Sequence, residues 1–264
     1  MSCSNFFKKT APAAFLVLCL ALAAVQTSGG APPGDESVRV PGSEKLTFRL
    51  QWGIIPVGRA VLESRPASGE GQSLSRLVVT ARSNAFVDLF FKVRDRIESL
   101  ADLSQGRSLW YFKNILEGER ERIFEVQFNE DQNLAERLEG GLVSTPVSTP
   151  KDTLDPLSFF YHVRGCELRE NAAFEAWVTD GKELTLGRVT VLGKERVQTP
   201  VGGFEAFRMQ VALKNMDGVF RTGERGEFTI WAAPRHGNMP VKIQCALAVG
   251  PFTGTMTAIL ASRP

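Results

Sequence analysis

Histidine is scarce in this chain: among 264 residues only His162 and His236 occur, far apart in the sequence. The chain also lacks the Cys-x-x-Cys and His-Glu-x-x-His patterns that place two metal ligands side by side. These absences argue against the common zinc sites. We therefore expect no bound metal and no cofactor.

Phosphate-binding loops are missing too. The pairs Gly140-Gly141 and Gly202-Gly203 are followed by neither a helix pattern nor a lysine at Walker spacing, so both predict turns. Basic and acidic residues nearly balance, at 31 against 29, and loss of the two lysines in the N-terminal segment described next brings the formal charge to zero. A neutral chain gives no electrostatic reason to bind nucleic acid, and no polybasic block predicts binding to anionic lipid.

A long apolar run stands near the N-terminus. Lys8 and Lys9 precede residues 11–25, and the run ends near Ala21-Leu22-Ala23, the small-x-small pattern that signal peptidase recognises. These 15 residues fall short of the roughly 20 needed to cross hydrocarbon. We predict a cleaved signal peptide over residues 1–24, a periplasmic location, and no transmembrane span after cleavage.

Acylation at Cys19 is the alternative, and it would anchor the protein to the outer membrane as a lipoprotein. Bacterial lipidation favours a small residue before the cysteine and a polar stretch after it. Here Leu18 precedes Cys19, and the apolar residues 20–24 follow. The pattern therefore favours a released protein.

Residues 25–43 are rich in Gly, Pro and Ser, which predicts a flexible leader before a single β-rich domain over residues 44–264. Within that domain the dominant pattern is alternation of apolar and polar residues with a period of two. It is clearest at four sets of apolar positions: Leu46, Phe48, Leu50 and Trp52; Phe124, Val126 and Phe128; Phe207, Met209, Val211 and Leu213; and Val241, Ile243, Cys245, Leu247 and Val249.

This alternation predicts an all-β fold, mainly antiparallel, with on the order of a dozen strands. We expect a strongly curved sheet or an incomplete β-barrel with one or two short helices. The better helix begins with Asp155 as N-cap and Pro156 at the first position and stops at Gly165; it would cover a sheet edge or barrel mouth. A second short helix or turn is expected between Asn84 and Phe91. The repeated Ser-Thr-Pro of residues 144–150 predicts an extended loop, either a domain boundary or, as we prefer, an insertion within one sheet.

One set of residues imitates an active site. Asp155, Ser158 and His162 would share roughly one face of the predicted helix, at spacings that permit a serine–histidine contact. An acyl-transfer site also needs a strained nucleophile turn and an oxyanion hole, and this helix offers neither. The favoured interpretation is structural: Asp155 caps the helix, and Ser158 and His162 are polar positions on a half-exposed helix. We therefore assign no catalytic residue.

Glutamates 117, 119, 121 and 125 suggest paired carboxylates on one strand face. Four arginines lie close in sequence or across neighbouring strands: Arg94, Arg96, Arg120 and Arg122. A solvated, salt-bridged face is therefore the favoured interpretation.

Only Cys166 and Cys245 remain after signal cleavage. In an oxidising compartment such a pair is a candidate disulfide, which would close a loop of roughly 80 residues and stabilise the fold by about 4 kcal/mol in the chain-entropy model. The alternative is a small buried thiol at Cys245, because it belongs to an apolar strand face.

Several segments resemble a bacterial exported family, the domain of unknown function 3108. They are LTFRLQWGIIPVG at residues 46–58, DPLSFFY at 155–161, PVGGFEAF at 200–207, and the ending from Trp231 through Met239-Pro240-Val241 to residues 250–254. The turn at residues 232–236 departs from the more acidic turn of the family. The resemblance implies a Gram-negative periplasmic β-rich domain and transfers no catalytic residue.

Two function classes follow. The first is a non-enzymatic exported envelope protein that binds a lipid or an envelope protein on an apolar concave side, motivated by the predicted export and by 18 Phe and 4 Trp. Core packing explains the same aromatics. The second class is an envelope hydrolase that uses Ser158 and His162. The ligand and the oligomeric state are not specified by the sequence.

Overall fold

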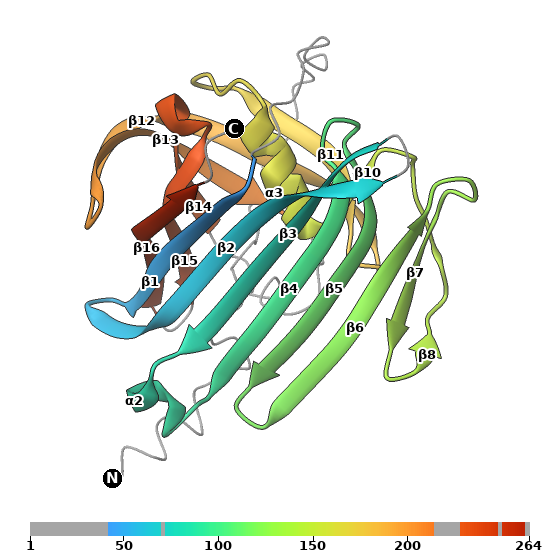
Figure 1. Ribbon diagram of the computed structural model, residues 1–264, viewed down its shortest axis with the longest axis horizontal. Coiled ribbons are helices and arrows are strands. Elements are labelled where there is room, and N and C mark those ends of the chain that lie inside the picture. Colours follow the sequence, from blue (N-terminus) through green and yellow to red (C-terminus); the bar gives the residue numbers. More distant parts are fainter. Residues whose placement is uncertain (1–41, 70–71, 214–227, 248–249, 262–264) are drawn as a thin grey trace.

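The computed structural model describes residues 42–69, 72–213, 228–247 and 250–261 (Figure 1). The predicted signal peptide and almost all of the predicted leader lie outside these residues. Sixteen strands of the described chain form one sheet. The strands are β1 Glu44–Trp52, β2 Ile55–Gly69, β3 Gln72–Ser83, β4 Val93–Asp102, β5 Arg107–Glu117, β6 Arg120–Asn129, β7 Leu134–Glu139, β8 Leu142–Val143, β9 Val147–Ser148, β10 Thr153–Leu154, β11 Ala173–Thr179, β12 Leu184–Thr199, β13 Gly202–Ala212, β14 Phe228–Ala233, β15 Met239–Leu247 and β16 Gly250–Ala261. The helices are α2 Ala85–Asp88, α3 Pro156–Gly165 and a 3₁₀ turn, η2 Pro234–His236.

The strand order is β10 to β16 followed by β1 to β8, with β9 paired to β7. The last strand therefore lies beside the first, and β1 pairs with both β16 and β2. Neighbours are antiparallel except β10 and β11. The path ends at β10 and at β8, so the sheet is curved but not closed, which confirms the expected incomplete barrel. The predicted loop at 144–150 contains β9, which joins the same sheet.

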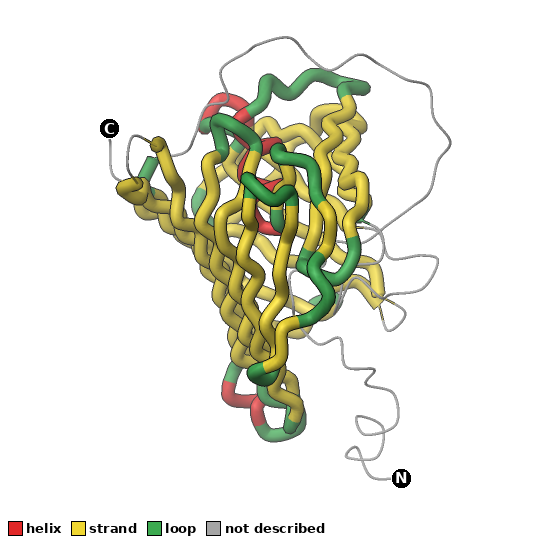
Figure 2. The backbone as a smooth tube through the Cα atoms, turned by 90° about the vertical axis from the view of Figure 1, so that its right-hand side faces the viewer, coloured by secondary structure: helices red, strands yellow, loops and turns green. Residues whose placement is uncertain are grey.

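The sheet bends because several strands carry register shifts, at which one extra residue bends and twists a strand. Such shifts lie between Thr47 and Phe48, between Leu100 and Ala101, and between Val191 and Gly193. Seen from the side, the strands wrap around the helix and narrow toward the end that carries α2 (Figure 2).

Alternation decides which side chains enter the core. On β1, Leu46 and Phe48 are fully buried while Arg49 is exposed. The apolar sets predicted on β6, β13 and β15 likewise join the main core cluster at Phe124, Met209 and Ile243.

Helix α3 has the predicted boundaries and cap. Nine of its ten residues are buried, and it lies inside the curved sheet (Figure 1). Its Phe159 and Phe160 face Val189 of β12 and Met209 of β13, while its cap contacts β4 and β5. The expectation of a half-exposed helix is wrong, because the sheet curves around both sides of it. The short helix expected between Asn84 and Phe91 is α2, capped by Asn84.

Candidate functional site

The N-terminus of α3 is held by a buried polar node around Asp155. Oδ1 accepts hydrogen bonds from the backbone N–H groups of Leu157 and Ser158 at 2.8 and 3.0 Å. Oδ2 accepts from the hydroxyls of Ser99 at 2.6 Å, Ser108 at 2.6 Å and Ser158 at 2.8 Å. Burial raises the pKa of Asp155, and the hydrogen bonds from Ser108, Ser99 and Ser158 oppose that rise. The node fixes the helix to β4 and β5.

The serine and histidine of the hydrolase hypothesis have different partners. Ser158 is fully buried, and its Oγ lies 2.6 Å from Ser108 Oγ as well as bonding Asp155. The ring of His162 contacts the carbonyl oxygen of Leu103, with Nδ1 at 3.0 Å. Ser158 thus completes a capping box and is closed to a substrate, so the geometry does not support nucleophilic catalysis at this helix.

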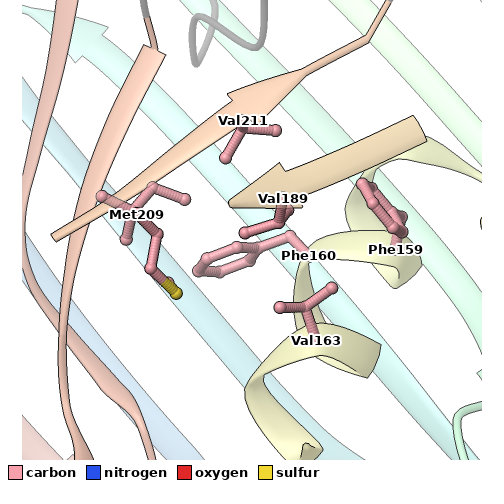
Figure 3. A pocket seen from close by; sticks show the side chains of 7 residues that line it. Phe159, Phe160, Val163, Val189, Met209 and Val211 are labelled. Carbon is pink, nitrogen blue, oxygen red and sulfur yellow. The ribbon is translucent and has the colours of Figure 1, made fainter. Parts of the chain in front are cut away.

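The packing around α3 leaves little space. Phe159, Phe160 and Val163 face four apolar residues of β12, β13 and β14 across a cavity of about 10 Å³ (Figure 3). A cavity of this size is at the lower limit for one water molecule. The apolar region beside α3 is therefore core, and it holds no room for a lipid chain.

A second polar group lies on the inner face of β4 and β5, and we call it the acid–lysine cluster: Asp95, Lys113 and Glu117. Asp95 is opposite Ala81 on β3 and Ile115 on β5, which both belong to the core. Residues directly opposite each other share a face, so the Asp95 side chain points inward. Lys113 and Glu117 flank Ile115 at alternate positions and share that face. All three residues are buried.

Burial dominates the electrostatics of this cluster. It raises the pKa of Asp95 to about 8, with the negative charge of Glu117 adding to the rise and with the charge of Lys113 and the backbone N–H of Leu116 opposing it. Burial also raises the pKa of Glu117 to about 7, against the charges of Lys113 and Arg122. Carboxyl groups with pKa values so far from normal are typical of functional sites.

The carboxylates of this cluster are poorly satisfied. Within the described part of the chain, Oε1 of Glu117 has no hydrogen-bond partner, and the Asp95 carboxylate has no side-chain donor, so that only the backbone N–H of Leu116 interacts with it. Buried polar atoms in native proteins nearly always have one, and an exception calls for an explanation such as a bound group. The cluster can hold a proton or accept hydrogen bonds from a ligand that carries donors.

Arg137 lies on the same inner face but is fully engaged. It is opposite Val126 of β6, and its guanidinium stacks 3.4 Å above the ring centre of Phe124. Its Nη2 donates to Glu139 at 2.8 Å and its Nη1 donates to the carbonyl oxygen of Asp180 at 3.1 Å. This arginine braces β7 against the turn after β11.

The structure corrects the glutamate face expected near residue 120. Glu117 pairs with Arg120 at the end of a hairpin, so Glu119 lies in the turn rather than on the same strand face. Glu125 accepts a hydrogen bond from the indole of Trp110, on the outer face. The arginines bind other acids: Arg94 with Asp88, Arg96 with Glu98, and Arg122 with Glu139.

Sequence reasoning therefore grouped Glu117 with the wrong neighbours and missed Asp95 and Lys113. A usable signal was present in the sequence. The apolar face of this strand is marked by Val93 and Ile97, and the carboxylate of Asp95 falls on the same face between them. Among the described residues no group of three or more His, Cys, Asp or Glu could hold a metal ion.

The candidate disulfide is not formed in the structure, where both cysteines are free thiols. Cys166 is half-buried after α3 and its carbonyl oxygen accepts from Asn238 at 2.7 Å. Asn238 precedes β15, whereas Cys245 lies seven residues further along that strand, roughly 20 Å away. Disulfides need Cα atoms within about 7 Å.

These features define a class of protein: a β-barrel-like open sheet that encloses a capped helix. The chain belongs to the family described as proteins of unknown function DUF3108, whose profile matches residues 47–257, as the resemblance of the sequence segments predicted. Among the described residues, none of the helices has the length and apolarity needed to cross a membrane.

A solved structure shares this fold. The β-barrel-like protein of domain of unknown function DUF1849 from Brucella abortus is 10% identical, with a TM-score of 0.56 over 86% of this chain and 100% of that one. A protein with a YmcC-like fold from Bacteroides fragilis, also 10% identical, covers 85% of this chain and 99% of its own with a TM-score of 0.31, too low to carry an argument. No curated protein matches the chain.

Proposed function

We propose that this protein is an exported, non-enzymatic component of the cell envelope, whose inner sheet face binds a lipid or another envelope component at the acid–lysine cluster. The observation that carries the proposal is the pair of buried carboxylates, Asp95 and Glu117, whose oxygens are poorly supplied with hydrogen-bond donors in the described chain. A ligand head group with N–H or O–H donors would supply those partners.

The surroundings of the cluster suit the apolar body of such a ligand. Asp95 is opposite Ala81, which is in turn opposite Ala60, so small apolar side chains extend the inner face over β3 and β2. Ile97 and Ile115 flank the carboxylate along β4 and β5. The combination of a small polar group with apolar walls is typical of sites for amphipathic ligands. The cavity beside α3 is too small for a lipid chain, so we place the proposed site on this part of the inner face instead.

The test begins with protein purified from the envelope. Native mass spectrometry and lipid extraction should reveal a bound lipid, and the delipidated protein should take up a fluorescent lipid. The double variant Asp95→Asn, Glu117→Gln should weaken uptake about tenfold or more, because each amide replaces an acceptor oxygen with an NH₂ group and each lost hydrogen bond is worth about 1 kcal/mol.

The matched control is Asp152→Asn, Glu119→Gln, which makes the same chemical change at two exposed positions. Uptake by this control should equal that of the unmodified protein. Consistently empty protein that also fails to take up fluorescent lipid would overturn the proposal, and so would equal uptake by the two double variants.

A further inference from the structure

Five apolar side chains are exposed together at one end of the sheet, and we call them the apolar tip: Ile54, Ile55, Phe86, Leu89 and Phe90. Their exposed fractions range from 45% for Phe90 to 92% for Ile54. They belong to the β1–β2 turn and to α2 with the residues that follow it, which lie at the same end of the sheet (Figure 1). Exposed apolar clusters of this kind mark sites that contact a membrane or another protein.

Hydrogen bonds connect the two segments that form the tip, so their exposed side chains belong to one continuous surface. The backbone N–H of Asn84 donates to the carbonyl oxygen of Val57 at 2.9 Å, and its side-chain Nδ2 donates to the carbonyl oxygen of Pro56 at 2.7 Å. The same Asn84 caps α2. One residue therefore fixes the position of Phe86 relative to Ile55.

A separate small core supports the tip from behind. Val57, Val87 and Val93 are buried against one another, with Trp52 and Phe252 packed on them. These two aromatic rings are stacked, with centres 6.1 Å apart. The tip is thus presented by a packed base.

Three exposed arginines stand in one row across the outer face behind the tip, and we call them the arginine row: Arg49, Arg59 and Arg82. Arg59 is directly opposite Arg49 on β1 and directly opposite Arg82 on β3. Like charges in such positions repel each other. In the described chain none of the three has an ion-pair partner, so the repulsion has no local compensation. Three neighbouring arginines without an internal counter-ion are suited to bind an anion from outside the protein.

The other charges named near the tip balance one another, so the arginine row sets a positive net charge there. Lys92 is exposed beside the tip, and Arg94 continues the row on β4 opposite Arg82. Asp88 is bound by Arg94. Glu119 and Glu121 of the β5–β6 hairpin flank Arg120, which supplies a cation of its own.

We propose that this end of the protein docks on an anionic lipid bilayer, with the apolar tip inserted among the acyl chains and the arginine row bound to phosphate head groups. The site is on the outer face, and the inference goes beyond the proposed function without depending on a ligand at the acid–lysine cluster. Apolar contact and basic charge together are what interfacial membrane binding requires.

The spacing fits this arrangement. Arg59 follows Ile55 by four residues, Arg82 precedes Phe86 by four, and Arg49 precedes Ile54 by five. At the rise of an extended strand this places Arg49 and Arg59 roughly 13 to 17 Å behind the tip. A tip that penetrates about 5 to 10 Å would bring the long arginine side chains to the head-group layer.

The experiment measures flotation of the exported protein with vesicles of phosphatidylcholine alone or of phosphatidylcholine with about one third phosphatidylglycerol. We expect binding to the anionic vesicles that falls as salt is raised. Arg59→Ala, Arg82→Ala should weaken this binding about 30-fold and leave the weak binding to neutral vesicles unchanged. Phe86→Ser, Leu89→Ser should weaken binding to both kinds of vesicle.

Two controls make the same changes elsewhere. Arg65→Ala, Arg169→Ala removes two exposed arginines far from the tip, and Leu186→Ser, Leu192→Ser removes two exposed leucines of β12. Both should bind like the unmodified protein. The salt dependence of the unmodified protein needs no variant and keeps the test valid if one fails to fold.

The proposal is overturned if the protein does not bind anionic vesicles, if the controls lose as much affinity as the tip and row variants, or if salt has no effect. Self-association that Phe86→Ser, Leu89→Ser abolishes, in the absence of vesicle binding, would assign the surface to a second copy of the chain instead. Failure of lipid uptake at the inner face would not affect this measurement, so the two proposals can fail separately.

Discussion

Glu44 and Arg164 form a buried ion pair that joins the first strand to the last turn of the enclosed helix. Nη1 of Arg164 lies 2.5 Å from Oε1 of Glu44, and Nη2 lies 3.2 Å from Oε2. The arginine side chain is 1% exposed, and its Nε also donates to the carbonyl oxygen of Asn238 at 3.2 Å. Three segments that are distant in sequence thus meet at one guanidinium.

The variant Glu44→Gln should therefore lower the free energy of unfolding by about 3 kcal/mol, because the buried arginine would keep its charge and lose its counter-ion. Urea unfolding followed by circular dichroism measures this change. The control is Glu175→Gln, whose partner Arg188 is solvent-accessible; there the loss should stay below about 1 kcal/mol. Equal losses in the two variants would contradict the structural role of the pair.

Removal of the Asp155 carboxylate should also destabilise the fold, by about 3 to 5 kcal/mol in Asp155→Ala. The change removes a helix cap and leaves the hydroxyls of Ser99 and Ser108 buried without their acceptor. Thermal unfolding monitors the effect, with the exposed Asp152→Ala as the control. A difference between the two variants smaller than about 1 kcal/mol would show that the node does not anchor α3.

Ser158→Ala addresses the hydrolase hypothesis directly. The substitution removes a capping-box hydroxyl, so we expect lower stability of about 1 kcal/mol. In a broad esterase and peptidase screen the variant and the unmodified protein should be equally inert. Activity of the unmodified protein that Ser158→Ala abolishes, with the fold intact, would restore the hydrolase hypothesis.

Stability should fall as the pH rises from about 4 to about 8 and should level off above that. The pKa values of Glu117 and Asp95 are raised to about 7 and about 8, so the folded state binds protons that the unfolded state has released above about pH 4. Over that range each unit of pH lowers the stability, and the decline ends once the carboxyls ionise in the folded state as well. Asp95→Asn keeps the shape and cannot ionise, so its stability should decline less, with a difference on the order of a few kcal/mol between about pH 5 and pH 9.

Urea unfolding of both proteins across that pH range measures the difference, and subtraction removes the contribution of all other groups. Asp152→Asn should follow the pH profile of the unmodified protein. Parallel profiles for Asp95→Asn and the unmodified protein would mean that Asp95 does not bind a proton on folding.

Alkylation distinguishes the two states of the cysteines. Because the structure places Cys166 and Cys245 far apart, denatured protein should gain two alkyl groups without any reductant. In the native state the half-buried Cys166 should react before the buried Cys245. Mass spectrometry counts the added groups. No alkylation until a reductant is added would instead establish the bridge that the predicted export signal and the cysteine count suggest.

Much of the fold could be predicted because the information is local. The alternation at Leu46 and Phe48 defines a strand face without reference to any other strand. Asp155, Pro156 and Gly165 define the start and the stop of α3 in the same way. The position of α3 could not be predicted, because the sequence of a helix does not say which of its sides will be covered. That depends on the strands packed around it, which come from distant segments of the chain.

The candidate surfaces could not be predicted from the sequence for a related reason. Arg49, Arg59 and Arg82 are far apart in the chain and form no basic block, so the sequence indicated no affinity for anionic lipid. The register of β1, β2 and β3 places them in one row. Asp95 and Lys113 likewise become neighbours only through the pairing of β4 with β5.

By itself the sequence determined the family, the β class of the fold, the faces of most strands and the ends of its main helix, because these depend on residue type and on spacing within one segment. Tertiary structure alone decided that the helix lies inside the sheet, that Ser158 is a buried cap partner, that two carboxylates share the inner face with Lys113, and that three arginines stand behind an apolar tip. Strand register and sheet curvature arise from pairings between distant segments, and no local pattern encodes them.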